Sequence, residues 1–285
     1  MQNENSSRIF EVYLNVEAHR LTADIVRGHS TNKQDVRETA LKNLDLSQCR
    51  NILDLGCGFG FFAEALAGRV HPQAFVVGLD IIKEYESSFL NTCKRSHLRG
   101  LFLSSDACSL KNLQDHAFDL VLCSYALYFF PEIIPQISRV LKPEGSFVSI
   151  THCEENMREF ISEAKETLMD SHFIKSAEQP IESIVRRFSS QNGYALLSSS
   201  FRTIIQTDYR NSLLFKEADL PDLVEYFRFK SPFFLSSGIS LKSDLVCDLL
   251  KHHLEGILRD SGHFRISKDD TIFICTEPIH GITNR

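Results

Sequence analysis

Short apolar runs alternate with segments of helical periodicity between residues 45 and 151. Each run has the length of one buried strand, and the segments between them repeat their apolar positions every three or four residues, as amphipathic helices do. Strands that alternate with helices form parallel βαβ units, so the pattern predicts an α/β fold. The predicted strands cover residues 51–55, 74–80, 101–107, 117–125 and 146–150; predicted helices begin at residue 62 and cover 84–97 and 131–141, and a turn follows at 142–145.

The regions outside this core have a mainly helical pattern. Before the core, apolar spacing predicts helices over residues 8–27 and 35–44. After it, two helices (157–168 and 181–188), a strand (201–215), two further helices (223–229 and 241–258) and a last strand (270–277) are predicted. We therefore expect an N-terminal helical lid over residues 1–44 and a main domain over 45–285, with a helical insertion over about 152–200. That insertion is either a cap over the acceptor pocket at the carboxyl edge of the sheet, where ligands bind, or a helical segment that only packs against the rest of the protein.

The first core strand ends in the sequence Asp54-x-Gly56-x-Gly58-x-Gly60. A strand, a glycine turn and a helix N-terminus present free backbone N–H groups and a positive dipole end to a ligand. A dinucleotide fingerprint needs a glycine at position 61, which is Phe61 here. An acid beside the turn suits a ligand with a positive group. A turn that binds nothing, or one that binds another nucleotide, are the alternatives.

A second acid, Asp80, closes the next strand, 20 residues past Gly60. In a doubly wound sheet, a carboxylate at this place accepts hydrogen bonds from a ribose diol. A helix N-cap is the alternative, because aspartate is favoured there. The spacing favours a ligand that contains adenosine.

Over roughly residues 45–151 the chain resembles the class I S-adenosylmethionine (SAM) methyltransferases. The resemblance is carried by the glycine motif and by the later sequence Phe118-Asp119-Leu120-Val121, which is followed by a helix and by Arg-Val-Leu-Lys-Pro-Glu-Gly at 139–145. The resemblance implies a doubly wound, mostly parallel seven-stranded sheet of the Rossmann-like methyltransferase fold, with two closing strands, one of them antiparallel. It implies SAM as cofactor, S-adenosylhomocysteine as product, and methyl transfer by in-line displacement.

The resemblance also implies site residues. Asp106 would bind the adenine amino group, although it could equally cap the following helix, and Tyr13 would close over the cofactor, although a packed core aromatic is the alternative. Two residues that follow the fourth and fifth strands, Tyr128 and His152, are candidate bases for the acceptor. Tyr128 stands where many relatives carry a histidine. A histidine such as His152 can act as a base near neutral pH, and a solvent-facing or core histidine is the alternative. The full set of expected cofactor-binding residues is Tyr13, Asp54, Leu55, Gly56, Cys57, Gly58, Gly60, Asp80, Ile81, Asp106, Ala107, Cys123 and Tyr125.

The composition of the chain restricts the kinds of molecule that we expect it to bind. A formal charge of −6 and a pI near 6.0 give no basic footprint for nucleic acid. The eight cysteines show no C-x-x-C pairs, the N-terminus lacks an apolar signal segment, and no apolar window is long enough to span a membrane. We expect a cytoplasmic protein without a metal site. The acceptor is expected to be a small molecule; a methyltransferase for protein or RNA and a non-catalytic SAM-binding module are the alternatives, and the oligomeric state is open.

Overall fold

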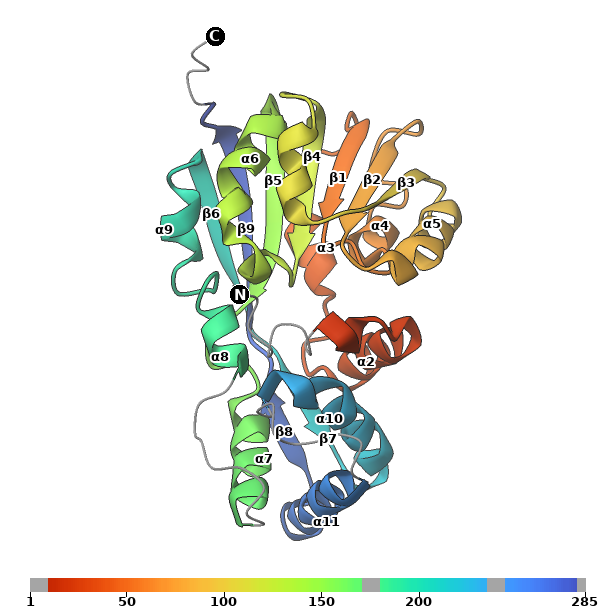
Figure 1. Ribbon diagram of the computed structural model, residues 1–285, viewed down its shortest axis with the longest axis vertical. Coiled ribbons are helices and arrows are strands. Elements are labelled where there is room, and N and C mark those ends of the chain that lie inside the picture. Colours follow the sequence, from red (N-terminus) through yellow and green to blue (C-terminus); the bar gives the residue numbers. More distant parts are fainter. Residues whose placement is uncertain (1–9, 171–179, 235–243, 281–285) are drawn as a thin grey trace. The chain divides into compact units, whose positions relative to one another are not determined.

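The computed structural model describes residues 10–170, 180–234 and 244–280 (Figure 1). The chain folds into two compact units. The sheet unit comprises the described parts of Gln34–Glu154, Val185–Tyr209 and Asp270–Arg285, and the helical unit those of Met1–Lys33, Glu155–Ile184 and Arg210–Asp269.

The sheet unit contains a seven-stranded sheet of order β3-β2-β1-β4-β5-β9-β6. Strands β1 to β5 pair in parallel, and β9 runs antiparallel to both β5 and β6. The expected fold class, including one antiparallel closing strand, is therefore confirmed. The elements are α3 (Val36–Leu41), β1 (Asn51–Leu55), α4 (Phe61–Ala65), β2 (Phe75–Asp80), α5 (Glu86–Arg95), β3 (Arg99–Ser104), β4 (Phe118–Ser124), α6 (Ile134–Val140), β5 (Leu141–His152), α9 (Gly193–Leu197), β6 (Phe201–Tyr209) and β9 (Asp270–Pro278).

The core of the sheet unit lies along the central strands. In β1, Ile52, Leu53 and Leu55 are fully buried, and in β4 the run 120–123 is as well. Strands covered by helices on both faces read as continuous apolar runs rather than as alternating ones, which is why these segments stood out in the sequence. Figure 1 shows α6 lying across β4 and β5.

The helical unit is built around a two-stranded antiparallel sheet of β7 (Ser212–Phe215) and β8 (Phe264–Ser267). Its interior is aromatic: the ring of Phe160 lies 5.7 Å from that of Tyr226 and 5.9 Å from that of Phe227. Its described helices include α2 (Val16–His29), α7 (Arg158–Asp170), α10 (Leu220–Phe234) and α11 (Asp244–Ser261). In sequence, α8 (Pro180–Val185) begins in the segment of this unit and ends at Val185, which is assigned to the sheet unit.

The segment expected to form a lid is shared between the units. Residues up to Lys33 belong to the helical unit, whereas α3 belongs to the sheet unit. The helices expected over 8–27, 181–188 and 241–258 are present in their described parts; residues 8, 9 and 241–243 and the side chain at 181 lie outside the described residues. The closing role of the lid stays a prediction.

Two local predictions were wrong, and one strand was not predicted. Residues 142–145 form no chain-reversing turn but an irregularity inside β5, where the pairing jumps from Phe118–Leu141 to Leu120–Ser146. The single strand expected over 201–215 is two strands, β6 and β7, in different sheets. The break comes at Arg210 and Asn211, which both bond to the Asp269 carboxylate. Strand β8 was not expected at all.

The helices and the cysteines bear on whether the chain spans a membrane or forms disulfides. Among the helices that the structure describes, none has the length and hydropathy needed to cross a membrane. All eight cysteines are free thiols.

Candidate cofactor and acceptor site

A glycine elbow, residues 54–60, joins β1 to α4. Gly56, Gly58 and Gly60 all have positive φ, of +64°, +49° and +90°. Gly60 is the N-cap of α4, and a Cβ added there would meet the Thr92 Cβ at 3.0 Å. At Gly56 a Cβ would meet the Ala126 Cβ at 2.5 Å. Glycine is therefore required at these two positions by both conformation and close packing.

Asp80, the last residue of β2, lies directly against the elbow. Its Oδ2 accepts a hydrogen bond from the Gly58 N–H at 2.9 Å, and its Oδ1 accepts one from the Ile82 N–H, also at 2.9 Å. Burial raises the pKa of this carboxyl, and the backbone donors at Ile82 and Gly58 oppose the shift. Each carboxylate oxygen has two acceptor positions, so one per oxygen remains for a ligand hydroxyl.

Asp54, the acid within the elbow, is almost completely buried, and its Oδ2 has no hydrogen-bond partner. Burial, together with the charge of Asp80, raises the pKa of the Asp54 carboxyl to about 8. Buried polar atoms in proteins are normally bonded, so an orphan carboxylate oxygen needs an explanation. A cation bound in the elbow would supply one.

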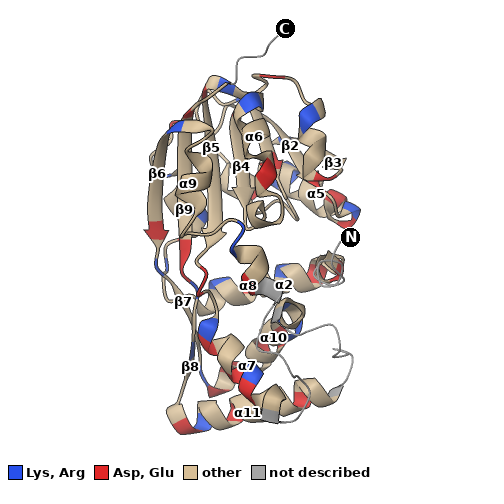
Figure 2. Cartoon of the chain, turned by 60° about the vertical axis from the view of Figure 1, so that its left-hand side comes forward, with Lys and Arg blue, Asp and Glu red and all other residues tan. Residues whose placement is uncertain are grey.

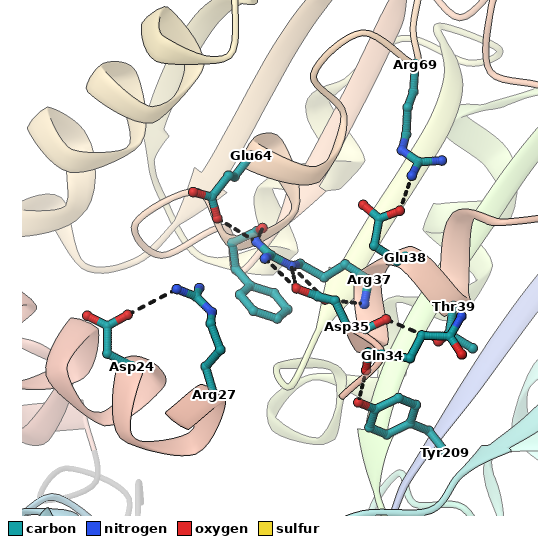
Figure 3. Close-up of polar contacts among 11 residues, drawn as sticks. Asp24, Arg27, Gln34, Asp35, Arg37, Glu38, Thr39, Glu64, Arg69 and Tyr209 are labelled. Atoms are coloured by element: carbon teal, nitrogen blue, oxygen red, sulfur yellow. Dashed lines mark hydrogen bonds and ion pairs between the residues drawn. The ribbon is translucent and has the colours of Figure 1, made fainter. Parts of the chain in front are cut away.

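Arg37 on α3 holds the start of α4 in place (Figure 3). The arginine donates to the Phe61 carbonyl oxygen and to Glu64 Oε2, each at 2.8 Å, while Asp35 accepts from its other edge at 2.7 Å. The guanidinium also lies 4.6 Å from the centre of the Phe61 ring. The second predicted helix of the lid segment thus supports the elbow from within the sheet unit.

A second polar group lies at the ends of β4, β5 and β9. His152 Nδ1 is 2.7 Å from Asp270 Oδ1, and the Tyr125 hydroxyl donates to Asp270 Oδ2 at 2.8 Å. The rings of Tyr125 and His152 stack with centroids 4.7 Å apart, and the Tyr128 ring lies 6.0 Å from that of His152. The structure therefore brings together both candidate bases and Tyr125. It places His152 inside β5, as its last residue, rather than after the strand.

Tyr125 connects this group to the elbow. The Tyr125 ring lies 6.1 Å from that of Phe61, the residue that follows Gly60. Tyr125 also adopts a φ of +54°, a conformation that is costly for a residue with a large side chain. Burial and the neighbouring Asp270 carboxylate raise the pKa of the Tyr125 phenol well above its ordinary value, so the phenol stays a donor.

The remaining expected residues differ in exposure. Ile81, beside Asp80, is 54% exposed, which is unusual for an isoleucine at the end of a buried strand and leaves an apolar surface for a ligand. The side chains of Leu55 and Cys123 are fully buried and belong to the core, as do those of Cys57 and Ala107. Asp106 is exposed and caps the helical turn Ala107–Asn112 through the Ser109 N–H.

Tyr13 lies in the helical unit, in an aromatic cluster. Its ring contacts His19 at 5.0 Å and both Phe229 and Phe233 at 5.9 Å. Within that unit Tyr13 is therefore packed among other aromatic side chains, which is the alternative given for it above. Its role toward the cofactor stays a prediction.

Sequence reasoning missed Asp270 and Arg37. Asp270 was recognised only as the start of the last strand, although its position opposite His152 in the β5–β9 pairing makes it the partner of that histidine. The register of an antiparallel pair 118 residues apart cannot be read from local patterns. An acid at the first residue of an apolar strand was the one signal available.

The fold and the site define a class: Rossmann-like enzymes that bind a nucleoside cofactor at a glycine elbow between the first strand and helix. A family profile described as a methyltransferase domain matches residues 46–208. The match covers more than half of the 285 residues, and the chain belongs to this family as a class I SAM-dependent methyltransferase. The orphan Asp54 oxygen, the positive-φ glycines and Asp80 fit SAM, whose methionine part carries positive charge.

Individual relatives agree with this assignment. The chain is 24% identical to a demethylmenaquinone methyltransferase of Bacillus cereus (strain B4264) over 160 residues, which is 55% of this chain and 67% of that protein. A solved structure from Bacillus halodurans C-125, named as a methyltransferase, aligns with a TM-score of 0.54 and 15% identity over 86% of this chain and 99% of that one. This second likeness supports the fold.

Proposed function

We propose that the chain transfers the methyl group of SAM to a small-molecule acceptor. The observation that carries the proposal is the contact between Asp80 and the Gly58 N–H, which holds a carboxylate at the place where the ribose of the cofactor is expected. In the proposed site, Asp80 accepts from the ribose hydroxyls and Asp54 faces the positive methionine end. Ile81 lies against the adenine, and Asp106 lies near its amino group.

The cofactor supplies an activated methyl group, because the positively charged sulfur is an excellent leaving group. The protein then contributes mainly by holding the acceptor in line with the methyl group and by excluding water. Tyr125, Tyr128 and His152 lie at the strand ends beside the elbow, and we assign the acceptor to this side of the sheet unit. A base is needed there only if the acceptor is protonated at the working pH.

Three observations support a small molecule rather than protein or RNA as acceptor. The formal charge is −6. Figure 2 shows basic and acidic positions interspersed along the drawn chain. The Bacillus cereus relative bears the name of an enzyme that methylates a quinone, a small molecule. A chain with a net negative charge gains little affinity from a phosphate backbone. We also propose a cytoplasmic location, which the eight free thiols support.

Calorimetric titration with SAM and with S-adenosylhomocysteine tests the cofactor site. We expect saturable binding of both, and a folded sample that binds neither at millimolar concentration would overturn the proposal. Incubation with tritium-labelled SAM and a cell lysate tests the acceptor. We expect label in the small-molecule fraction; label only in protein or RNA would select that alternative, and cofactor binding without any transfer would select the non-catalytic module.

A further inference from the structure

Asp270 forms a buried carboxylate bridge between two aromatic side chains of the sheet unit. Its two oxygens are divided between His152 Nδ1, at 2.7 Å, and the Tyr125 hydroxyl, at 2.8 Å. The Asp270 side chain is only 3% exposed, whereas that of His152 is 10% exposed. The Asp270 carboxylate is therefore the more deeply buried of the two groups, and the His152 imidazole is the more exposed.

This arrangement selects one form of the histidine. A carboxylate can only accept, so Nδ1 carries the proton that it donates to Oδ1. In the neutral ring the other nitrogen, Nε2, is then the basic one. A buried negative charge next to the imidazole also stabilises the ring when Nε2 takes up a second proton. The Tyr125 hydroxyl donates to the second oxygen of Asp270, which restrains the carboxylate in the orientation that faces His152.

The geometry points to an acid–base unit in which His152 is the general base for the methyl acceptor, and Asp270 and Tyr125 are its positioning residues. This inference rests on the proposed function and adds the acceptor class: a molecule whose attacking atom carries an acidic hydroxyl, phenolic or enolic. An acceptor with a free lone pair needs no such base.

The balanced step follows from these groups. His152 Nε2 takes the hydroxyl proton of the acceptor, and the acceptor oxygen (or the carbon conjugated to it) forms a bond to the methyl carbon. The carbon–sulfur bond breaks with its electron pair remaining on sulfur, which loses its positive charge. The positive charge ends on the imidazolium, next to Asp270. Proton release to solvent restores the neutral ring.

Other titratable groups also face this unit. Tyr128 follows β4 beside His152, and Tyr209 at the end of β6 pairs with Asp270 in the sheet. The phenols of Tyr128 and Tyr209 and the carboxylate of Asp35, which lies near Tyr209, contribute to the local potential. Asp35 is ion-paired with Arg37. Asp270 is bonded directly to His152.

Nuclear magnetic resonance of protein labelled with ¹⁵N-histidine tests the unit without any acceptor. The His152 signals are assigned by their loss in His152→Gln. We expect the Nδ1–H tautomer in the wild type. In Asp270→Asn the titration midpoint of the ring is expected to fall by about one pH unit or more, since an adjacent opposite charge is lost. Tyr125→Phe, which keeps the ring but removes the hydroxyl, leaves the Asp270 charge in place and should therefore change the midpoint less than Asp270→Asn does. Asp45→Asn and Tyr194→Phe, at exposed positions, serve as matched controls.

The outcomes are distinguishable. An Nε2–H tautomer, or equal midpoints in the wild type and Asp270→Asn, overturns the inference even if SAM binds normally. Failure of the wild type to bind SAM overturns the proposed function instead. If Asp270→Asn does not fold, the tautomer of the wild-type ring decides, because an Nε2–H ring contradicts the inference without any variant. Mass spectrometry of the methylated product from a metabolite extract should show a former phenol or enol, and transfer to an amine or thiol alone contradicts the acceptor class.

Discussion

The backbone N–H of Gly58 donates to Oδ2 of Asp80 over 2.9 Å, and thereby joins positions that are 22 residues apart in the chain. The bond ties the end of β2 to the middle of the glycine elbow. With Oδ1 held by the Ile82 N–H, the carboxylate is oriented before any ligand arrives. A preoriented acceptor pair loses little entropy when it binds a diol.

Replacing Asp80 with alanine should weaken SAM binding by about 1–3 kcal/mol, which is roughly 5- to 150-fold in Kd, because buried hydroxyls of the ligand lose their acceptors. Calorimetry measures the change. Asp24→Ala, which removes an exposed aspartate from a surface ion pair, is the control and should leave Kd unchanged. An unaltered Kd in the Asp80 variant would show that the ribose lies elsewhere.

Replacing Arg37 with methionine should destabilise the protein by about 2–3 kcal/mol. The arginine side chain is only 8% exposed and bonds Asp35, Glu64 and the Phe61 carbonyl oxygen. Breaking a buried pair typically costs about 3–5 kcal/mol, but both carboxylates here can be rehydrated, so the lower figure applies. Urea unfolding gives the value. Arg27→Met, on a surface helix, should not shift the midpoint; equal midpoints for both variants would refute the supporting role of Arg37.

Gly60→Ala and Gly68→Ala separate backbone strain from packing. Both glycines have positive φ, of +90° and +72°, so alanine should cost about 1–2 kcal/mol at each. Only at Gly60 would the new Cβ crowd a neighbour, the Thr92 side chain at 3.0 Å, whereas Gly68 has open space around it. We therefore expect Gly60→Ala to be the more destabilising of the two in denaturant melts, and to weaken SAM binding as well. Equal losses would mean that the elbow tolerates a side chain.

The elements around the elbow were predictable because their determinants are local. A continuous apolar run, a glycine every second residue and an acid at the end of each of two strands are all visible within residues 51–80. Those signals report backbone conformations that only glycine adopts easily, together with strands buried on both faces. The doubly wound arrangement of the strands was implied by the resemblance to the methyltransferases rather than by these local signals.

The acceptor side was not predictable in the same way. His152 and Tyr125 were candidates by position, but their partner Asp270 comes 118 and 145 residues later in the chain. The β5–β9 register places Asp270 opposite His152, and the β4–β5 pairing places Tyr125 beside them. The break between β6 and β7 was hidden for a similar reason. The β-rich pattern continues through Arg210 and Asn211, and the contact that ends the strand comes from the distant Asp269.

Asp54 should make the stability of the fold depend on pH. Burial raises the pKa of this carboxyl to about 8 in the folded protein, against about 3.9 in an unfolded chain. Between these values the unfolded state binds fewer protons, so the free energy of unfolding falls as pH rises from about 4 to 8, by up to about 5 kcal/mol. Asp54→Asn should remove most of this slope in urea titrations at several pH values. The raised pKa of Asp80 acts in the same direction and leaves a residual slope.

The same carboxyl should release a proton when SAM binds. At pH 7 the Asp54 carboxyl of the free protein is mainly protonated, since its pKa is about 8 and its Oδ2 has no partner. A cation placed next to it favours the ionised form and lowers the pKa. The binding enthalpy should therefore vary with the ionisation enthalpy of the buffer, and the slope should approach one proton released per site. In Asp54→Asn the dependence of the binding enthalpy on the buffer should vanish. S-adenosylhomocysteine keeps the ammonium group but lacks the charged sulfur, so its binding should release a smaller fraction of a proton. A wild-type enthalpy that is independent of buffer would show that the positive end of the cofactor does not face Asp54.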